Sequence, residues 1–243
     1  MVNIKHTHTR HKPIYKKFVS LRKNVQNRQK VYTFKKQKWQ FLLSLIARQN
    51  KTRKKSFNFF DQFSNNVSKF NTYFSKNYKK KVTTKKVFLL FYGNLSEKLL
   101  KKMTTVSKIK SDQVSNKLNS ATFFNKFFEQ RLDVVLLRSH FVLSIRNSRQ
   151  LIAHGNVFVN GDRVKNSSFV LKKGDCIQFS KKVYPLLQTY IVKSTLWPLP
   201  ASYLQISYKS FQISLVNSII LANTSDKFSL WLNTNEVMGI FKK

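Results

Sequence analysis

The residues best suited to chemistry lie between positions 145 and 154, where Arg146, Arg149 and His154 are spaced to share one side of a helix. Arg138 and Lys165 can flank this side. Guanidinium groups form bidentate hydrogen bonds to phosphate and also stack on exposed bases. The opposite side of the helix carries residues suited to a core, namely Ile145, Ser148, Leu151 and Ile152. The pattern therefore predicts a surface that recognises an RNA backbone by its shape.

The elements that must position these side chains form a compact module. Gly155 is placed to end the helix in a left-handed conformation. The expected elements, in chain order, are a helix over 131–140, a helix over 145–154 capped by Ser144, a strand over 156–160, a tight turn at Asn160-Gly161, a turn at 173–175 and a strand over 176–180. The module is thus predicted to be two helices and a small sheet.

The charge of the chain indicates the partner of this module. The 243 residues contain 46 Lys and Arg against 9 Asp and Glu, a formal net charge of +37. Residues 1–120 hold 30 of those basic residues and only 3 acidic ones. Such an excess requires a polyanion, for which nucleic acid is the first expectation and an acidic membrane surface the alternative. No apolar run is long enough to span a bilayer.

The remaining candidates for chemistry favour no reaction and no metal. Cys176 is the only cysteine, which rules out an internal disulfide and a cysteine-based zinc site. His6, His8 and His11 have no carboxylate nearby, so contact with RNA or solvent is favoured over a metal. Asp133 lies in an Arg-Leu-Asp motif that also occurs around the catalytic Asp of pseudouridine synthases. The apolar residues after it favour a helix interior, with Asp133 as a first-turn carboxylate.

The chain divides into four parts around the module, and the expected fold class is α+β. A helical RNA-binding body carries the inserted module and a C-terminal β-hairpin. Phe123, Phe124, Phe127 and Phe128 form a helical stripe that favours core packing over base stacking. Residues 50–86 lack a regular period, so a loop, a variable insertion or a disordered segment is expected there. The predicted parts are a basic extension over 1–30, the helical first part of the body over 31–128, the module over 129–183, and the hairpin with a closing helix over 184–243.

The order of these motifs resembles the RNA-binding module named after small-subunit ribosomal protein S-four. The flanks favour the ribosomal family over the tyrosyl-tRNA synthetases, pseudouridine synthases and heat-shock protein that share the module. Residues 91–102, 199–216 and 233–241 are similar to the helix pair, hairpin and closing helix of that family, and its mitochondrial form is the most similar. The matching pieces are Arg131-Leu132-Asp133, the Ser144 cap, Arg149-Gln150-Leu151-Ile152, His154-Gly155, Val157-x-Val159-Asn160-Gly161, Arg163-Val164 and Lys173-Gly174-Asp175-x-Ile177.

The resemblance implies a structural constituent of the small ribosomal subunit with no enzymatic activity and no cofactor. It implies early binding to a helix junction of small-subunit rRNA, near the channel through which mRNA enters, beside the ribosomal proteins numbered three and five. A mitochondrion is the expected location, and a plastid is the alternative. An RNA-modifying enzyme and a free RNA chaperone with the same module are the rival hypotheses. The candidate RNA-binding residues are Arg131, Arg138, Arg146, Arg149, Gln150, His154, Asn160, Arg163, Lys165 and Lys172.

Overall fold

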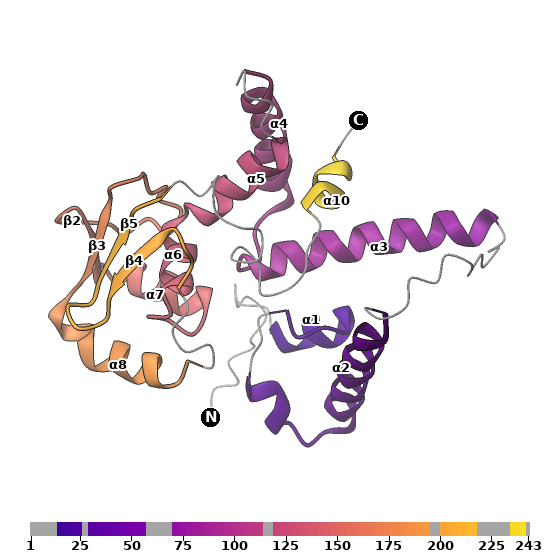
Figure 1. Cartoon of the computed structure of the whole chain (residues 1–243). Helices are drawn as coiled ribbons and strands as arrows, with labels where there is room; N and C mark the ends of the chain where they lie inside the picture. The colour runs from indigo at the N-terminus through magenta and orange to yellow at the C-terminus, as the bar shows by residue number, and fades with distance from the viewer. Residues whose placement is uncertain are drawn as a thin grey trace, which may run out of the picture. The chain divides into compact units, whose positions relative to one another are not determined.

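The computed structural model describes residues 14–25, 29–56, 70–113, 119–194, 200–217 and 234–241. These residues fall into two compact units, Met1–Val87 and Phe88–Lys243, which are described one at a time. Helix α3 begins in the first unit and ends in the second (Figure 1). The predicted α+β class is confirmed, since several helices accompany one antiparallel sheet.

The first unit is helical where it is described, and aromatic side chains form much of its core. The ring of Tyr15 meets Phe34 edge-on with 5.1 Å between the ring centroids, and meets Trp39 at 6.1 Å. Phe18, one turn along the same helix, is fully buried. The elements are α1 (Ile14–Leu21), the 3-10 helix η1 (Gln29–Thr33), α2 (Gln37–Ser56) and the first part of α3 (Phe70–Phe91).

Part of the expected basic extension is helical, and the described residues of the segment 50–86 are helical where a loop was one of the expectations. Helix α1 occupies residues of the basic extension and buries Ile14 and Phe18. Helix α2 continues to Ser56 and α3 begins at Phe70, both within the segment expected to be a loop. The hydroxyl groups of Thr83 and Thr84 donate to carbonyl groups one turn earlier in α3, so they need no outside partner. Residues 57–69, and the three N-terminal histidines, lie outside the described residues.

The second unit contains the module and its flanks. Helix α5 packs against α4, and α10 contacts α5 (Figure 1). Phe123, Phe124 and Phe128 of the predicted phenylalanine stripe are buried, the last two against Phe88, whereas Phe127 is half-buried with Lys110 over its ring. The helices are α4 (Glu97–Gln113), α5 (Ser120–Glu129), α6 (Leu132–Arg138), α7 (Ile145–Ala153), the 3-10 helix η2 (Lys181–Val183), α8 (Tyr184–Val192) and α10 (Thr234–Gly239).

A five-stranded antiparallel sheet runs through this unit in the order β2-β1-β3-β5-β4. The predicted hairpin, β4 and β5, is present, but it does not stand apart from the module. Strand β5 pairs with β3, placing Ile213 opposite Ile177, and Ile177 is opposite Val159 of β1 on its other side. Module and hairpin therefore share one sheet. The strands are β1 (Val157–Val159), β2 (Asp162–Arg163), β3 (Cys176–Phe179), β4 (Leu204–Ser207) and β5 (Gln212–Leu215).

One apolar core joins the inner face of this sheet to the helices of the module. The strands alternate, so that Val157 and Val159 are buried while Phe158 between them is half-buried. Helices α6 and α7 contribute Leu136 and Ile152, both fully buried, to the same cluster. Burial of this kind contributes ~25 cal/mol per Å² of apolar surface. Because the sheet and the two helices bury their apolar surface against each other, each stabilises the other.

The local signals at the turns of the module are confirmed. The Ser144 hydroxyl caps α7 by accepting a hydrogen bond from the backbone N–H of Asn147 at 3.2 Å. Gly155 follows α7 with φ of +67°, as a left-handed helix end requires. Asn160 and Gly161 have φ of +53° and +93°, which is the pattern of a type I′ hairpin turn.

Candidate nucleic-acid interface

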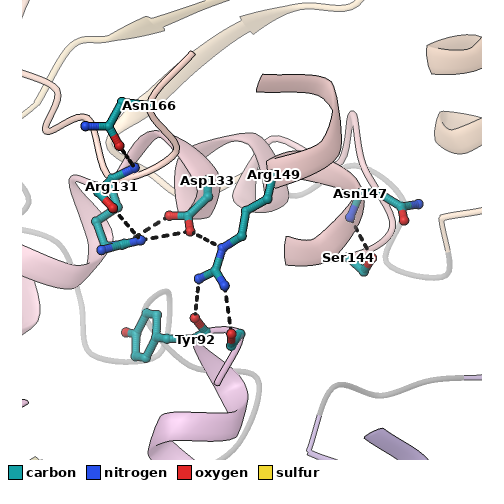
Figure 2. Close-up of polar contacts among 9 residues, drawn as sticks. Tyr92, Arg131, Asp133, Ser144, Asn147, Arg149 and Asn166 are labelled. Carbon is teal, nitrogen blue, oxygen red and sulfur yellow. Dashed lines mark hydrogen bonds and ion pairs between the residues drawn. The ribbon is translucent and has the colours of Figure 1, made fainter. Parts of the chain in front are cut away.

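A buried carboxylate fixes the two helices of the module to each other. Asp133 of α6 is fully buried between two guanidinium groups (Figure 2). Arg131 donates from Nε and Nη2 to the two carboxylate oxygens at 3.0 Å each, and Nε of Arg149 donates to Oδ2 at 2.8 Å. The free-energy cost of burying the Asp133 carboxylate is offset by these two ion pairs, as a buried charge requires. The sequence predicted Asp133 only as a carboxylate in the first turn of its helix. In the structure it also joins that helix to α7.

Arg149 also connects α7 to the turn that follows α3. Its two terminal nitrogens donate to the carbonyl oxygens of Gly93 at 2.7 Å and Tyr92 at 2.9 Å (Figure 2). The sequence had placed Arg149 on the exposed side of the helix with Arg146 and His154. The structure instead turns its guanidinium inward, where it holds three parts of the unit together.

A second buried carboxylate, that of Glu129, lies at the end of α5. It accepts hydrogen bonds from the hydroxyl groups of Tyr92 at 2.7 Å and Tyr203 at 2.9 Å. Arg138 of α6 adds a bidentate pair, with both N–O distances at 3.0 Å. Burial, followed by the negative charge of Glu129, raises the pKa of Tyr92 well above its usual value of 10.0. The cluster is structural rather than reactive, because each of these polar groups forms a hydrogen bond to another group of the cluster.

The chain just after α7 presents a third arrangement, and this one faces solvent. Arg163 of β2 donates from Nε to the carbonyl oxygen of Gly155 at 2.7 Å and from Nη2 to that of His154 at 3.1 Å. These bonds cap the C-terminal end of α7 with a positive charge, which suits the negative end of the helix dipole. Arg163 and His154 are nevertheless both exposed. The fold thus brings the side chain of Arg163 to the backbone of His154, another predicted RNA-binding residue.

Asn160 is held by the loop opposite it. Its side-chain amide donates to Oδ1 of Asp175 at 3.0 Å and its side-chain oxygen accepts from the backbone N–H of Cys176 at 2.8 Å. The other carboxylate oxygen of Asp175 accepts from the backbone N–H of Lys172 at 2.7 Å. These contacts keep the two turns of the module side by side. They also fix the backbone of Lys172, whose side chain is exposed.

The ten predicted site residues therefore fall into different environments. Arg131, Arg138 and Arg149 form intramolecular ion pairs with buried carboxylates. Arg146 is half-buried on α7. The others are exposed: Gln150, His154, Asn160, Arg163, Lys165 and Lys172. An RNA-binding role for any of the ten remains a prediction.

Sequence reasoning missed the residues that complete the two buried clusters. Glu129, Tyr92 and Tyr203 come from separate stretches of the chain and meet only in the folded unit. One signal was present, since a carboxylate at the end of a phenylalanine-rich helix is unusual without a partner. Nothing local indicated which arginine or tyrosine would supply that partner.

Two findings on the described residues concern groups of metal ligands and membrane-spanning helices. Within them, no three His, Cys, Asp or Glu side chains are grouped as metal ligands would be. None of the helices in the described ranges combines the length and the apolar character needed to cross a bilayer.

Residues 130–177, which form this part of the structure, match the family described as S4 domain. The match covers α6, α7, both turns and the strands up to β3.

Comparison with whole proteins narrows the similarity to a ribosomal family. Small ribosomal subunit protein uS4 of Aquifex aeolicus is 36% identical over 91 residues, which are 37% of this chain and 40% of that protein. The protein of the same name from Carsonella ruddii is 41% identical over 100 residues, 41% of this chain and 46% of its own length. The chain thus spans less than half the length of these relatives. The predicted resemblance to the uS4 family is confirmed over this region.

Proposed function

We propose that this protein is a structural component of the small ribosomal subunit that binds small-subunit rRNA. The observation that carries the proposal is the S4 domain, combined with relatives named as small ribosomal subunit proteins. The net charge of +37 supports it, because a chain this basic is neutralised by a polyanion such as rRNA.

The exposed residues around the end of α7 are the surface we propose for RNA. The guanidinium of Arg163 is fixed there by its bonds to the backbone carbonyl groups of His154 and Gly155. Lys165 and Lys172 add flexible positive charge on the same S4 domain. Arg131, Arg138 and Arg149 act in this proposal as supports, because their ion pairs keep α6 and α7 rigid. Rigid donors lose less entropy when they meet phosphates.

The proposal extends to the position of the chain in the small subunit and to the stage of assembly at which it binds. We infer early binding at a helix junction of the rRNA, near the channel through which mRNA enters, with ribosomal proteins three and five as neighbours. These points rest on the family resemblance. An organelle, the mitochondrion first and a plastid second, is supported by 36 Lys against 10 Arg, a bias expected from A/T-rich codons.

The test is sedimentation of an organelle lysate through a sucrose gradient, with an antibody against this chain. We expect the chain to migrate with the small subunit and to remain there in moderate salt. A peak at the top of the gradient, away from both subunits, contradicts the proposal. The free chaperone and the modifying enzyme would then be tested directly, by RNA annealing and by RNA modification assays with the purified chain.

A further inference from the structure

The first unit contains a pocket between α1 and α2, two helices that contact each other (Figure 1). Its volume is about 300 Å³, at the lower end of the roughly 300–1,000 Å³ typical of small-molecule sites. Most of its lining is apolar, which suits a flat apolar group better than a hydrated ion. The residues that line this α1–α2 pocket are Val19, Ser20, Arg22, Phe41, Leu42 and Leu45.

Phe41 supplies an aromatic ring to the α1–α2 pocket. The relative exposure of Phe41 is 60%, although its neighbour Leu42 is fully buried. Leu45 lines the pocket one turn further along α2. The helix therefore holds an exposed ring beside the pocket. A ring in this position can stack on a planar group such as a nucleobase.

Arg22 adds positive charge to the pocket from an unusual backbone conformation. It follows the last residue of α1 with φ of +52°, where glycine is the usual residue. Its backbone N–H donates to the carbonyl oxygen of Val19 at 3.1 Å, and that of Lys23 donates to Phe18 at 3.2 Å. Glycine would close the helix in the same way without the strain of a Cβ. Strain of this kind is often found at functional sites.

The surroundings of the pocket favour an anionic ligand. Residues 1–60 contain no Asp or Glu. Exposed lysines lie on both helices, Lys16 on α1 and Lys38 on α2. An apolar pocket in this field is complementary to a ligand that joins a flat ring to a phosphate. An apolar peptide lacks the charge, and an inorganic anion lacks the ring.

We propose that the α1–α2 pocket binds one unpaired nucleobase of RNA, with Phe41 stacked on the base and Arg22 bound to an adjoining phosphate. Proteins recognise single-stranded RNA by combining stacking of this kind with positive charge. Guanidinium groups are suited to phosphate. A paired base does not fit, because its ring is stacked within a duplex. The inference rests on the proposed function for the choice of RNA as the ligand, and it adds a contact outside residues 130–177.

Photo-cross-linking of the purified full chain tests this inference. The probe is a single-stranded RNA oligonucleotide of 5-bromouridine, whose bases form adducts with aromatic rings stacked on them. We expect mass spectrometry to map the adduct to Phe41, with a yield about tenfold above that at Tyr32. Tyr32 of η1 is the matched control, because its relative exposure is 55% and it does not line the pocket.

Two outcomes of this experiment overturn the proposal. One is an equal yield of adduct at Phe41 and at Tyr32. The other comes from the same oligonucleotide paired with oligoadenosine, whose bases are stacked in a duplex. The duplex should give no adduct at Phe41 above that at Tyr32, so an equal Phe41 yield from duplex and single strand contradicts the binding of an unpaired base.

A substitution of Arg22 separates binding from stability. Arg22→Gly removes both the guanidinium and the backbone strain. The melting temperature should therefore rise while the yield of the Phe41 adduct falls about fivefold. Lys16→Ala, the control, removes the same charge from an exposed position of α1 and should leave the yield within about twofold. An unchanged yield in Arg22→Gly, or an equal loss in Lys16→Ala, overturns the proposal.

The cross-linking result and the sedimentation result are independent of each other. A chain that forms the Phe41 adduct but stays at the top of the gradient refutes only the proposed function. A chain that migrates with the small subunit but gives no Phe41 adduct above the control refutes only this inference.

Discussion

Oδ2 of Asp133 accepts a hydrogen bond of 2.8 Å from Nε of Arg149, across the interface between α6 and α7. The same guanidinium reaches the carbonyl groups of Tyr92 and Gly93. One ion pair thus sets the position of the helix that carries His154 at its end. Arg149 was predicted to bind RNA directly. In this fold it helps instead to position other candidate RNA-binding residues.

Removing the charge of Asp133 is expected to destabilise the second unit strongly. Asp133→Asn leaves Arg131 and Arg149 without their counter-charge, and breaking a buried pair costs ~3 kcal/mol or more in the free energy of unfolding. Urea denaturation followed by circular dichroism measures the change. Asp162→Asn on the exposed strand β2 is the control and should stay within about 0.5 kcal/mol of the native chain. Equal effects of the two substitutions would refute the structural role of Asp133.

Loss of a single hydroxyl next to Glu129 should also be measurable. Tyr203→Phe removes a hydrogen bond to a buried carboxylate, and we expect a loss of ~2 kcal/mol in unfolding free energy. The comparison is Tyr208→Phe, whose hydroxyl donates to the neutral carbonyl of Ser139 at 3.2 Å. That change should cost ~1 kcal/mol or less. Thermal denaturation of both variants decides whether the charged acceptor makes the difference.

Stability in alkali should depend on Tyr92. Its pKa is raised by burial first and by Glu129 second, so the folded state keeps the phenol protonated where the unfolded state loses the proton. The contribution is fully present below about pH 10 and is lost as the pH rises above it, by up to ~1.4 kcal/mol per pH unit. Tyr92→Phe should show a shallower decline of unfolding free energy between about pH 10 and pH 11.5. Parallel declines in the two proteins would contradict this assignment.

The two glycines of the α7–β1–β2 segment should differ in their tolerance of a methyl group. A Cβ at Gly155 would overlap the Arg163 guanidinium that caps α7, whereas a Cβ at Gly161 would meet no atom within 4 Å. Both positions have positive φ, so each alanine costs ~1 to 2 kcal/mol for the backbone alone. Gly155→Ala should therefore lower the melting temperature more than Gly161→Ala. The reverse order would show that Arg163 is not held where the structure places it.

The proposed RNA surface predicts a change in salt dependence. Lys165→Ala with Lys172→Ala should weaken binding to a small-subunit rRNA fragment and reduce the slope of log affinity against log salt by about 2. Fluorescence anisotropy over a series of KCl concentrations measures both quantities. Lys182→Ala with Lys193→Ala removes the same charge from the ends of α8 and should leave the slope nearly unchanged. Equal slopes for the two double variants would place the RNA contact elsewhere.

Local signals predicted the module well because its turns are specified by a few neighbouring residues. The Ser144 cap, the end of α7 at Gly155 and the Asn160-Gly161 turn each depend on backbone conformations that those residue types favour. The pairing of β3 with β5 could not be predicted in the same way. These strands are separated in the sequence by α8. Hydrophobic alternation indicates that a segment is a strand, but it does not indicate which other strand pairs with it.

The inward turn of Arg149 and the helical α3 were missed for different reasons. Helical spacing places the Cα of Arg149 beside the buried face, and a side chain this long can point either way. Only the partner Asp133, itself buried, decides the direction. The first part of α3 includes the run Lys79-Lys80-Lys81 and lacks an apolar stripe, so the apolar signal indicated only its end, from Val87 onward.

The sequence similarity to the S4 domain ends at residue 177, in the middle of β3, while the strand continues to Phe179 and is paired on both sides. The stretch that was inherited as a recognisable domain is therefore smaller than the stretch that must fold together. Cut to residues 130–177, it would leave an open sheet edge and would separate Arg138 from Glu129. We therefore expect that a graft of the module into another protein would have to include the hairpin.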